Sequence, residues 1–253
     1  MTNLTNQISR HSAVILVLLT FFAFANKVAG QIYDIRDHWY IGPQIGLVSF
    51  FGDLSVHDFD LARKISDESD LGLGLIVGKS VNRLIDARVN YLHGKMKGSN
   101  PGLDMSFKNN FDEIGFGLTI SLSRLILPYK VTKLDLVATA GIGYINSRSI
   151  KYRLSNGTYL SSEGYTIEKQ PVIIASSSLT IPLGVELNYR FSKNWVASGG
   201  FSFRLYNEDL LDSHIGITGI NDRYSVAHFG LYHIINPIQK KAYRIPYGCE
   251  NSF

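Results

Sequence analysis

The clearest alternation of hydrophobic and polar positions in the chain lies in residues 179–205. From residue 179 to residue 191 every second residue is apolar, and the residues between them are small or polar. After a turn at residues 192–194, the same alternation resumes over residues 195–205. Successive side chains of a β-strand point to opposite faces, so this pattern predicts a hairpin with one hydrophobic and one polar or glycine-rich face. Each strand has about ten residues, which is typical of a membrane-spanning barrel strand.

Six further segments alternate in the same way, which gives eight predicted strands in total. The six segments are residues 39–48, 71–78, 85–92, 114–123, 134–145 and 223–235. The links between the strands alternate in length, and no amphipathic helix of ordinary length interrupts the series. Parallel βαβ units need such helices. The chain is therefore predicted to have an all-β fold, an eight-stranded antiparallel up-and-down transmembrane β-barrel.

The link lengths and the aromatic residues both orient this barrel in a membrane. Outer-membrane barrels have long outer loops and short periplasmic turns, so four long links are predicted to lie outside: residues 52–70, 94–110, 147–177 and 207–222. Aromatic side chains prefer the two interfaces of a bilayer. A periplasmic aromatic belt is predicted from Trp39, Tyr189, Phe191 and Trp195, and an opposite rim from Phe50, Tyr91, Tyr144, Tyr206 and Tyr224.

The first 30 residues have the features of an export signal. Arg10 precedes a continuous apolar run over residues 13–25, and small residues follow it. The run is too short to span a bilayer comfortably, so residues 1–30 are predicted to be a cleaved signal peptide. Cleavage after Gly30 is preferred over cleavage after Ala25, and a retained anchor helix is the other alternative. No second long apolar run follows in the sequence.

Composition excludes some classes of function. The 253 residues include 18% charged residues, and the mean hydropathy of +0.04 is too polar for a helical membrane protein. A barrel has such values because only one face of each strand meets lipid. The net charge of +4 falls to +2 without residues 1–30, which contain Arg10 and Lys27 but no acid, so no nucleic-acid partner is predicted. Cys249 is the single cysteine, which excludes an internal disulfide and favours no cysteine-based metal site.

Three strings in the predicted strands carry a resemblance to a known family. They are WYIGPQIGL in the first strand, IGFGLTISLS in the fourth and LTIPLGVELNYRFSKNWVASGG in the hairpin. With them, residues 31–236 resemble the OmpA-like β-barrel family, particularly the stand-alone outer-membrane barrels of Bacteroidota. The resemblance implies the outer membrane of a Gram-negative bacterium. Larger family members carry a peptidoglycan-binding domain after the barrel; residues 237–253 are too few for one and are predicted to be a short periplasmic tail.

Charged residues at the polar positions of the strands are predicted to share the narrow lumen. They are Asp86, Arg88, Glu186, Arg190, Arg204 and His228. An eight-stranded barrel is just wide enough for side chains to fill, and buried charges must pair. Glu186 and Arg204 are expected to pair with each other, either in a polar plug or in the wall of a selective pore. Pro182 has no N–H for the ladder, so a bulge or a missing hydrogen bond is expected beside it.

No motif in the loops predicts catalysis or a cofactor. The Asp, His and Ser residues of the first and last loops have neither calcium-loop spacing nor a convincing triad arrangement. The expected function is non-enzymatic: an envelope-structural or surface-interaction role of a monomer surrounded by outer-membrane lipid, with residues 52–70 and 147–177 as candidate contacts for a surface ligand or protein. The alternatives are a narrow pore through the lumen and a soluble lipocalin-like periplasmic binder, which the polar interior positions disfavour.

Overall fold

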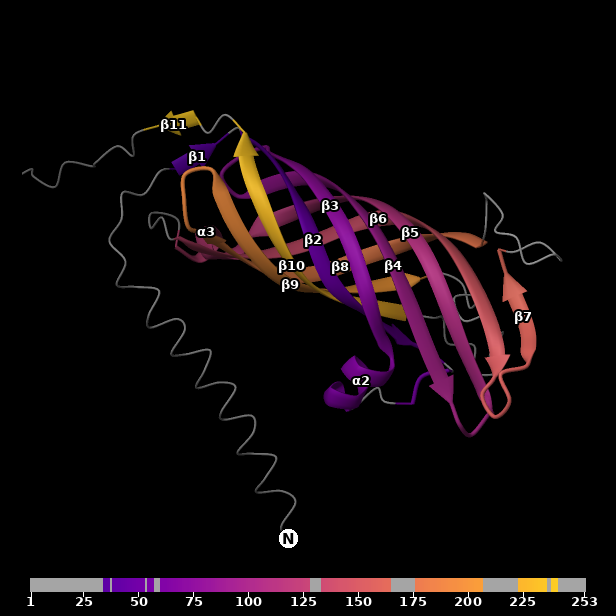
Figure 1. The fold of residues 1–253 in the computed structure, drawn as a ribbon. Helices are drawn as coiled ribbons and strands as arrows, with labels where there is room; N and C mark the ends of the chain where they lie inside the picture. Colours follow the sequence, from indigo (N-terminus) through magenta and orange to yellow (C-terminus); the bar gives the residue numbers. More distant parts are fainter. Residues whose placement is uncertain are drawn as a thin grey trace, which may run out of the picture.

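The computed structural model describes residues 34–36, 38–52, 54–56, 60–127, 133–164, 176–206, 223–235 and 238–240. The predicted signal peptide, the whole of the predicted last outer loop and Cys249 lie outside these residues. The described part holds eight long strands, with three short elements at one end of them and two at the other (Figure 1). No helix among the described residues is long and apolar enough to cross a membrane.

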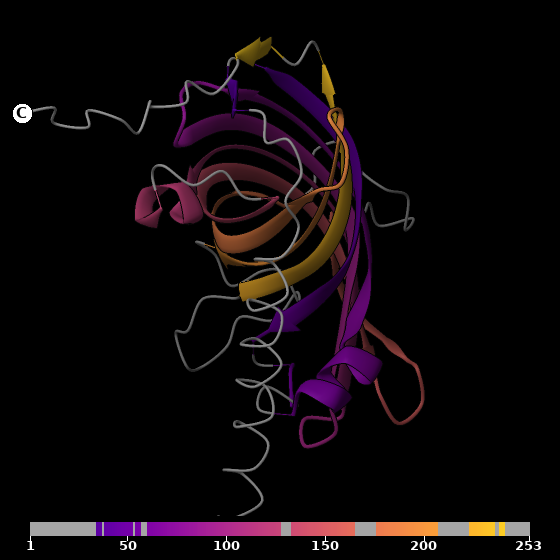
Figure 2. The same ribbon diagram turned by 90° about the vertical axis from the view of Figure 1, so that its left-hand side faces the viewer.

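Eight strands of the described chain close into an antiparallel barrel, which confirms the predicted fold class (Figure 2). They are β2 (Trp39–Phe51), β3 (Ser69–Ser80), β4 (Ile85–Asn100), β5 (Met105–Ser121), β6 (Leu134–Arg153), β8 (Ser176–Arg190), β9 (Trp195–Tyr206) and β10 (Arg223–Ile235). Each pairs with the next along the chain. Pairing of β10 with β2 then closes the ring. The hairpin of residues 179–205 is the β8–β9 hairpin, with Arg190 opposite Val196 beside its turn.

Short elements decorate the two ends of the barrel. At one end β1 (Asp34–Arg36) pairs with β11 (Ile238–Lys240), so part of the predicted tail forms a strand. The helix α3 (Leu122–Ile126) lies at that end too, in the link after β5 (Figure 1). At the other end are the helix α2 (Leu61–Asp67) and the strand β7 (Tyr159–Glu163), which extends the sheet beside β6.

Three strands are much longer than predicted, and the expected link over residues 94–110 is wrong. Strands β4 and β5 run through it and leave only a four-residue turn, Pro101 to Asp104, in which Asp104 has a positive φ of 52°. Strand β6 likewise continues to Arg153, into the expected loop of residues 147–177. These extensions project from the barrel in Figure 1. The predicted loop of residues 94–110 is therefore largely β-structure, and so are residues 147–153 and 159–163 of the next predicted loop.

The extensions were not predicted because the apolar face of each strand changes from the outside of the barrel to the inside, a change that we call the phase inversion. On β5 the apolar residues from Ile120 to Ile114 point outward, whereas Phe111 and Phe107 point inward and are fully buried. Strand β4 changes likewise between Tyr91, which is exposed, and Met96, which is buried. The alternation continues, but the apolar residues now face inward and the polar ones outward. In the sequence this change resembles the end of a strand. The inversion divides the barrel into a part with a hydrophobic outer surface and a part with a hydrophobic interior.

The two prolines in the barrel strands interrupt the hydrogen-bond ladder. Between β6 and β8 the partners run to Ala140–Leu183 and resume at Gly143–Thr180, with no pair at Pro182 and no change of register. The expectation of a missing hydrogen bond beside Pro182 is confirmed, without a bulge. Pro43 leaves the same gap between β2 and β10. Both prolines keep their pairing on the other side, opposite Arg204 and Leu75.

Candidate functional site

The lumen contains two separate ion-pair clusters, stacked along the barrel axis. The first is centred on Glu186 of β8, whose side chain is 2% exposed. The Arg88 guanidinium donates to its Oε2 at 2.9 Å, and the Tyr232 hydroxyl lies 3.4 Å from its Oε1. His228 Nε2 lies 3.4 Å from Oε2 without the alignment of a hydrogen bond. Gln44 Nε2 donates to the Tyr232 hydroxyl at 2.8 Å. Because these residues come from β2, β4, β8 and β10, the cluster ties opposite walls together.

The second cluster lies nearer the strand extensions and is centred on Glu113 of β5, which is fully buried. Arg204 Nε donates to Glu113 Oε2 at 2.8 Å, and the Tyr224 hydroxyl donates to the same oxygen at 2.7 Å. Arg204 also donates to the Ser202 hydroxyl. Its guanidinium carbon lies 5.6 Å from the centre of the Tyr224 ring. Every charge in this cluster has an opposite charge or a hydroxyl beside it.

The predicted pairing of Glu186 with Arg204 is wrong. Glu186 lies opposite Gly200 on β9, four residues before Arg204, so the two side chains are separated by roughly 13 Å of strand. Arg204 instead meets Glu113, a residue that was not predicted because it lies between the predicted link of residues 94–110 and the predicted strand of residues 114–123. The signal was present: Glu113 has the same inward parity as Gly115 and Gly117, one step beyond the predicted strand.

Four of the six predicted lumen residues meet in these clusters, and two do not. Arg88, Glu186, Arg204 and His228 lie within them. Asp86 is half-buried in register with Ser80 and Thr119, near the end of the barrel that carries the tight turns. Arg190 is half-buried at the last position of β8.

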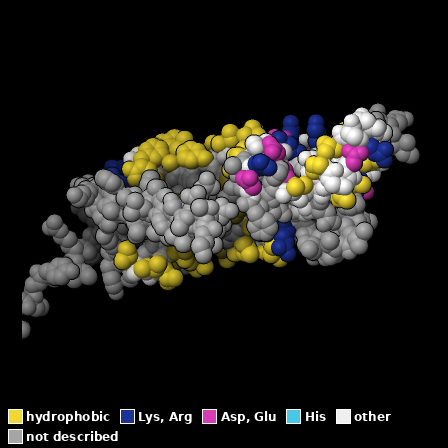
Figure 3. Space-filling model, turned by 90° about the horizontal axis from the view of Figure 1, so that it is seen from below, with side chains coloured by type: hydrophobic (Ala, Val, Ile, Leu, Met, Phe, Trp, Pro, Cys, Tyr) yellow, Lys and Arg dark blue, Asp and Glu magenta, His cyan; other side chains and the backbone are white. Residues whose placement is uncertain are grey.

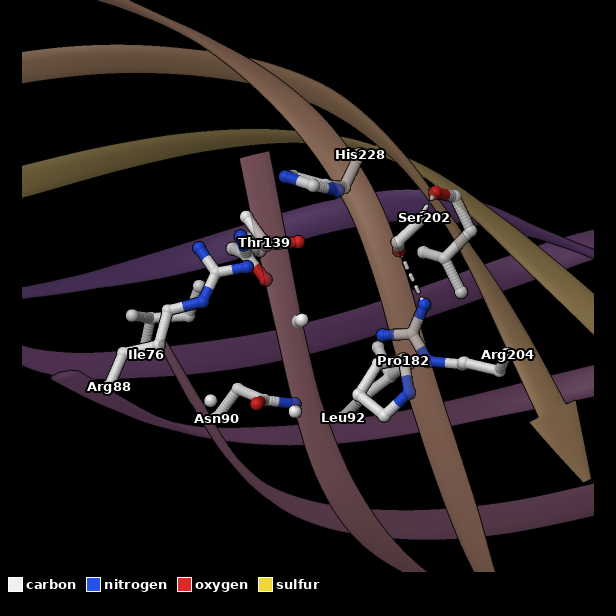
Figure 4. Close-up of a pocket in the computed structure, with 14 residues that line it drawn as sticks. Ile76, Arg88, Asn90, Leu92, Thr139, Pro182, Ser202, Arg204 and His228 are labelled. Carbon is white, nitrogen blue, oxygen red and sulfur yellow. Dashed lines mark hydrogen bonds between the residues drawn. The ribbon is translucent and has the colours of Figure 1, made fainter. Parts of the chain in front are cut away.

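A small cavity separates the two clusters (Figure 4). Its volume is about 30 Å³, which is room for one or two water molecules. Arg88 and Arg204 line it from opposite sides, and His228, Asn90 and Thr139 also line it (Figure 4). His228, which lines the cavity, has a buried Nε2 without a hydrogen-bond partner, and this is the kind of group that such a water satisfies.

An apolar core closes the lumen beyond the second cluster. It comprises Val48, Phe50, Leu54, Leu92, Met96, Phe107, Phe111, Ile145, Tyr224 and Val226. The Phe50 and Phe107 rings meet edge to face with centroids 4.7 Å apart. The expectation that Phe50 and Tyr224 belong to an outer aromatic rim is therefore wrong: both side chains are 0% exposed and point inward. They lie beyond the phase inversion, where inward positions are the hydrophobic ones.

The segment after β2 covers this apolar core. Leu54 enters the core, and α2 follows with Asp60 as its N-cap. Lys64 Nζ lies 2.7 Å from Glu68 Oε2, and this buried ion pair also binds the Ser55 hydroxyl. Burial acts to raise the pKa of Glu68, but hydrogen bonds from Lys64, the Val56 N–H and Ser55 outweigh it and hold that pKa below its usual value. The described residues of the predicted polar loop over residues 52–70 thus form a folded cap, in which Leu54 enters the core and α2 packs against the ends of β2 and β3.

The outer surface of the barrel is hydrophobic between the tight turns and the phase inversion. The four residues of the predicted periplasmic belt, Trp39, Tyr189, Phe191 and Trp195, are all exposed at the turn end. At the opposite edge Tyr91, Ile114 and Tyr144 are cross-strand neighbours in one row. The side chain of Tyr206 lies outside the described residues. Figure 3 shows hydrophobic side chains along the barrel and charged ones towards the strand extensions.

Comparisons with known proteins give structural similarity without sequence relatives. No protein-family model matches the sequence, and no curated protein is similar to it. Among solved structures, the attachment invasion locus protein Ail of Yersinia pestis is 10% identical over 79% of this chain and 100% of that chain, with a TM-score of 0.46. Neisserial surface protein A is 13% identical over 77% and 96%, with a TM-score of 0.43. The N-terminal β-barrel domain of Pseudomonas aeruginosa OprF is 11% identical over 79% and 99%, with a TM-score of 0.44. These values carry no argument about function.

Proposed function

We propose that this chain is a non-enzymatic, monomeric outer-membrane barrel of a Gram-negative bacterium, with a closed lumen and a surface role outside the membrane. The observation that carries the proposal is the apolar outer surface of the barrel, which ends at the phase inversion. Large apolar side chains such as Ile45, Leu73, Phe116 and Phe201 are between 48% and 52% exposed around the barrel. Soluble monomers rarely expose so continuous an apolar surface, whereas lipid covers it at no cost.

The height of this hydrophobic outer surface, which lies between the tight turns and the phase inversion and is called the apolar band below, fits a bilayer. Its length on β9 is the ten residue steps from Trp195 to Leu205, about 34 Å of strand, or about 26 Å of height at a tilt of about 40°. That matches the apolar band of about 25 Å found on membrane barrels. Beyond the band the outward positions become polar and the inward ones apolar, as in a water-soluble β-structure. The membrane boundary therefore falls at the inversion.

The contents of the lumen favour a plug over a pore. The ion pairs of both clusters join different walls. The cavity between them holds about 30 Å³, and the apolar core with Leu54 closes the mouth. A conducting path needs a continuous wet route, and buried paired charges instead resist separation. The surface role falls to the strand extensions and the α2 cap, which are the parts that project beyond the apolar band.

Fractionation and conductance test this proposal together. The protein should pellet with outer membranes and migrate differently on a gel before and after boiling; recovery in the periplasmic fraction would refute the membrane assignment. In a planar bilayer the folded protein should give no steps above background. Steady conductance that changes with Arg204→Ala would refute the plug and support a narrow pore.

A further inference from the structure

Successive rows of outward side chains on β4, β5 and β6 change character in a regular order beyond the apolar band. The last apolar row is Tyr91–Ile114–Tyr144. The next rows, moving away from the band, are His93–Asp112–Asn146, Lys95–Asn110–Arg148 and Lys97–Lys108–Ile150. Three neighbouring strands thus place four cations in two adjacent rows on one outward face.

Little negative charge balances this face within these strands. Asp112 is the one acid in the rows, and it accepts hydrogen bonds from the Tyr91 hydroxyl at 2.6 Å and pairs with His93 at 2.8 Å. Arg148 is close enough to Asp112 to act on its charge. No ion pair among the described residues includes Lys95, Lys97 or Lys108.

Lys97 and Lys108 are direct cross-strand partners. Like charges in that position destabilise a sheet, and an anion bound between them would offset their repulsion. The arrangement therefore has a folding cost that a bound anion removes.

The height of the two cationic rows above the apolar band indicates which kind of anion they would bind. Each row adds about 7 Å along the strand, or about 5 Å of height at the usual tilt. The two cationic rows therefore lie about 10 and 16 Å above the aromatic edge, and long lysine side chains reach back toward the membrane. Headgroups occupy roughly the first 5 to 8 Å beyond the hydrocarbon of each leaflet. Lysine side chains that reach back by about 6 Å bring the ammonium groups of the two rows to about 4 and 10 Å, on either side of this layer.

We propose that Lys95, Lys97, Lys108 and Arg148 form a binding site for the phosphate groups of outer-leaflet lipid headgroups. The site rests on the proposed membrane position of the barrel, because only that position brings headgroups to this face. It would fix the rotation and depth of the barrel and order one or more lipids against the extension. The lysines supply point charges to the phosphates, and Asn110 lies between them as an uncharged donor.

The test measures retention of lipid A, a bis-phosphorylated glycolipid, by the folded full-length chain in a zwitterionic detergent, as phosphorus per protein after gel filtration across a lipid concentration series. Lys95→Gln, Lys97→Gln and Lys108→Gln together should weaken binding about 100-fold, because each lysine at an anionic membrane surface contributes about fivefold. The matched control replaces Lys79, Lys133 and Lys193 by Gln at the other end of the barrel, with the same loss of charge, and should retain the lipid. Equal binding by the wild type and the first variant, or equal losses in both variants, would overturn the proposal.

Two further arms separate folding and soluble anions from lipid binding. Lys97→Glu creates a cross-strand pair with Lys108, so it should fold at least as well as the wild type and still lose lipid A; retained binding would contradict the site. If the triple variant loses dextran sulfate but keeps lipid A, the face serves a soluble polyanion and the lipid assignment is wrong. Boiled and unboiled gel mobility is read in parallel, so that failure to form a membrane barrel is distinguished from failure to bind lipid.

Discussion

Breaking the Glu113–Arg204 pair should destabilise the barrel more than removing it altogether. Glu113 is fully buried and the Arg204 side chain is 8% exposed, with the charged atoms 2.8 Å apart. Glu113→Leu leaves a buried guanidinium unpaired, and Arg204→Met leaves a buried carboxylate with Tyr224 as its remaining donor. Each single substitution should lower the free energy of unfolding by about 3–5 kcal/mol. The double variant should be more stable than either single one, because apolar residues that replace a whole buried ion pair are often neutral.

Urea unfolding of the folded barrel in lipid vesicles measures this, with tryptophan emission as the signal. Trp39 and Trp195 are 51% and 39% exposed on the outer surface and report loss of the lipid environment. Glu186→Gln combined with Arg204→Met provides the control. Those sites lie in different clusters, so their effects should add within about 0.5 kcal/mol. A double Glu113→Leu/Arg204→Met variant no more stable than the singles, or stronger coupling of Arg204 to Glu186, would refute the assignment of the pairs.

Three other predictions concern the cap, the apolar core and the close packing of the wall. The lowered pKa of Glu68 means that its contribution to stability is present above the ordinary pKa of 4.5 and is lost as the pH falls through the lowered value; protease cleavage within residues 53–68 should rise over that range, and Glu68→Gln should remove this pH dependence. Phe107→Ala should lower the free energy of unfolding by about 3–5 kcal/mol in urea titrations, whereas Phe116→Ala, on the outward face, should cost much less. Gly78→Ala places a methyl group against the Tyr40 ring and should cost about 1–3 kcal/mol; Gly199→Ala, with its nearest neighbour at 4.0 Å, should be tolerated, and equal losses would contradict the packing.

The barrel itself was predictable from the sequence because alternation within the apolar band is local and strong. Residues 179–205 carry that information without help from the rest of the chain. The gap in the hydrogen-bond ladder beside Pro182 was also predictable, because a residue without an N–H cannot donate to a neighbouring strand. These features depend on strand geometry alone.

The contents of the lumen were harder to predict because pairing there depends on stagger around the barrel. Alternation placed Glu186 and Arg204 inside correctly, but it gives no height along the barrel axis. The register of β8 and β9 separates the two residues, and closure of the barrel brings Arg204 to Glu113 of β5. The strand extensions were missed for another reason. Met96, Phe107 and Phe111 follow the same period of two as the band, but with the opposite face apolar, so the inversion resembles the end of a strand.

The most direct measurement of the membrane boundary is labelling of single cysteines on intact cells with a membrane-impermeant maleimide, in a Cys249→Ser background. Lys97→Cys lies outward beyond the inversion and should label readily. Leu118→Cys, outward within the apolar band, and Met96→Cys, inward within the apolar core, should both be protected until the protein is unfolded. Labelling at Leu118→Cys together with protection at Lys97→Cys would contradict the proposed position of the barrel in the membrane.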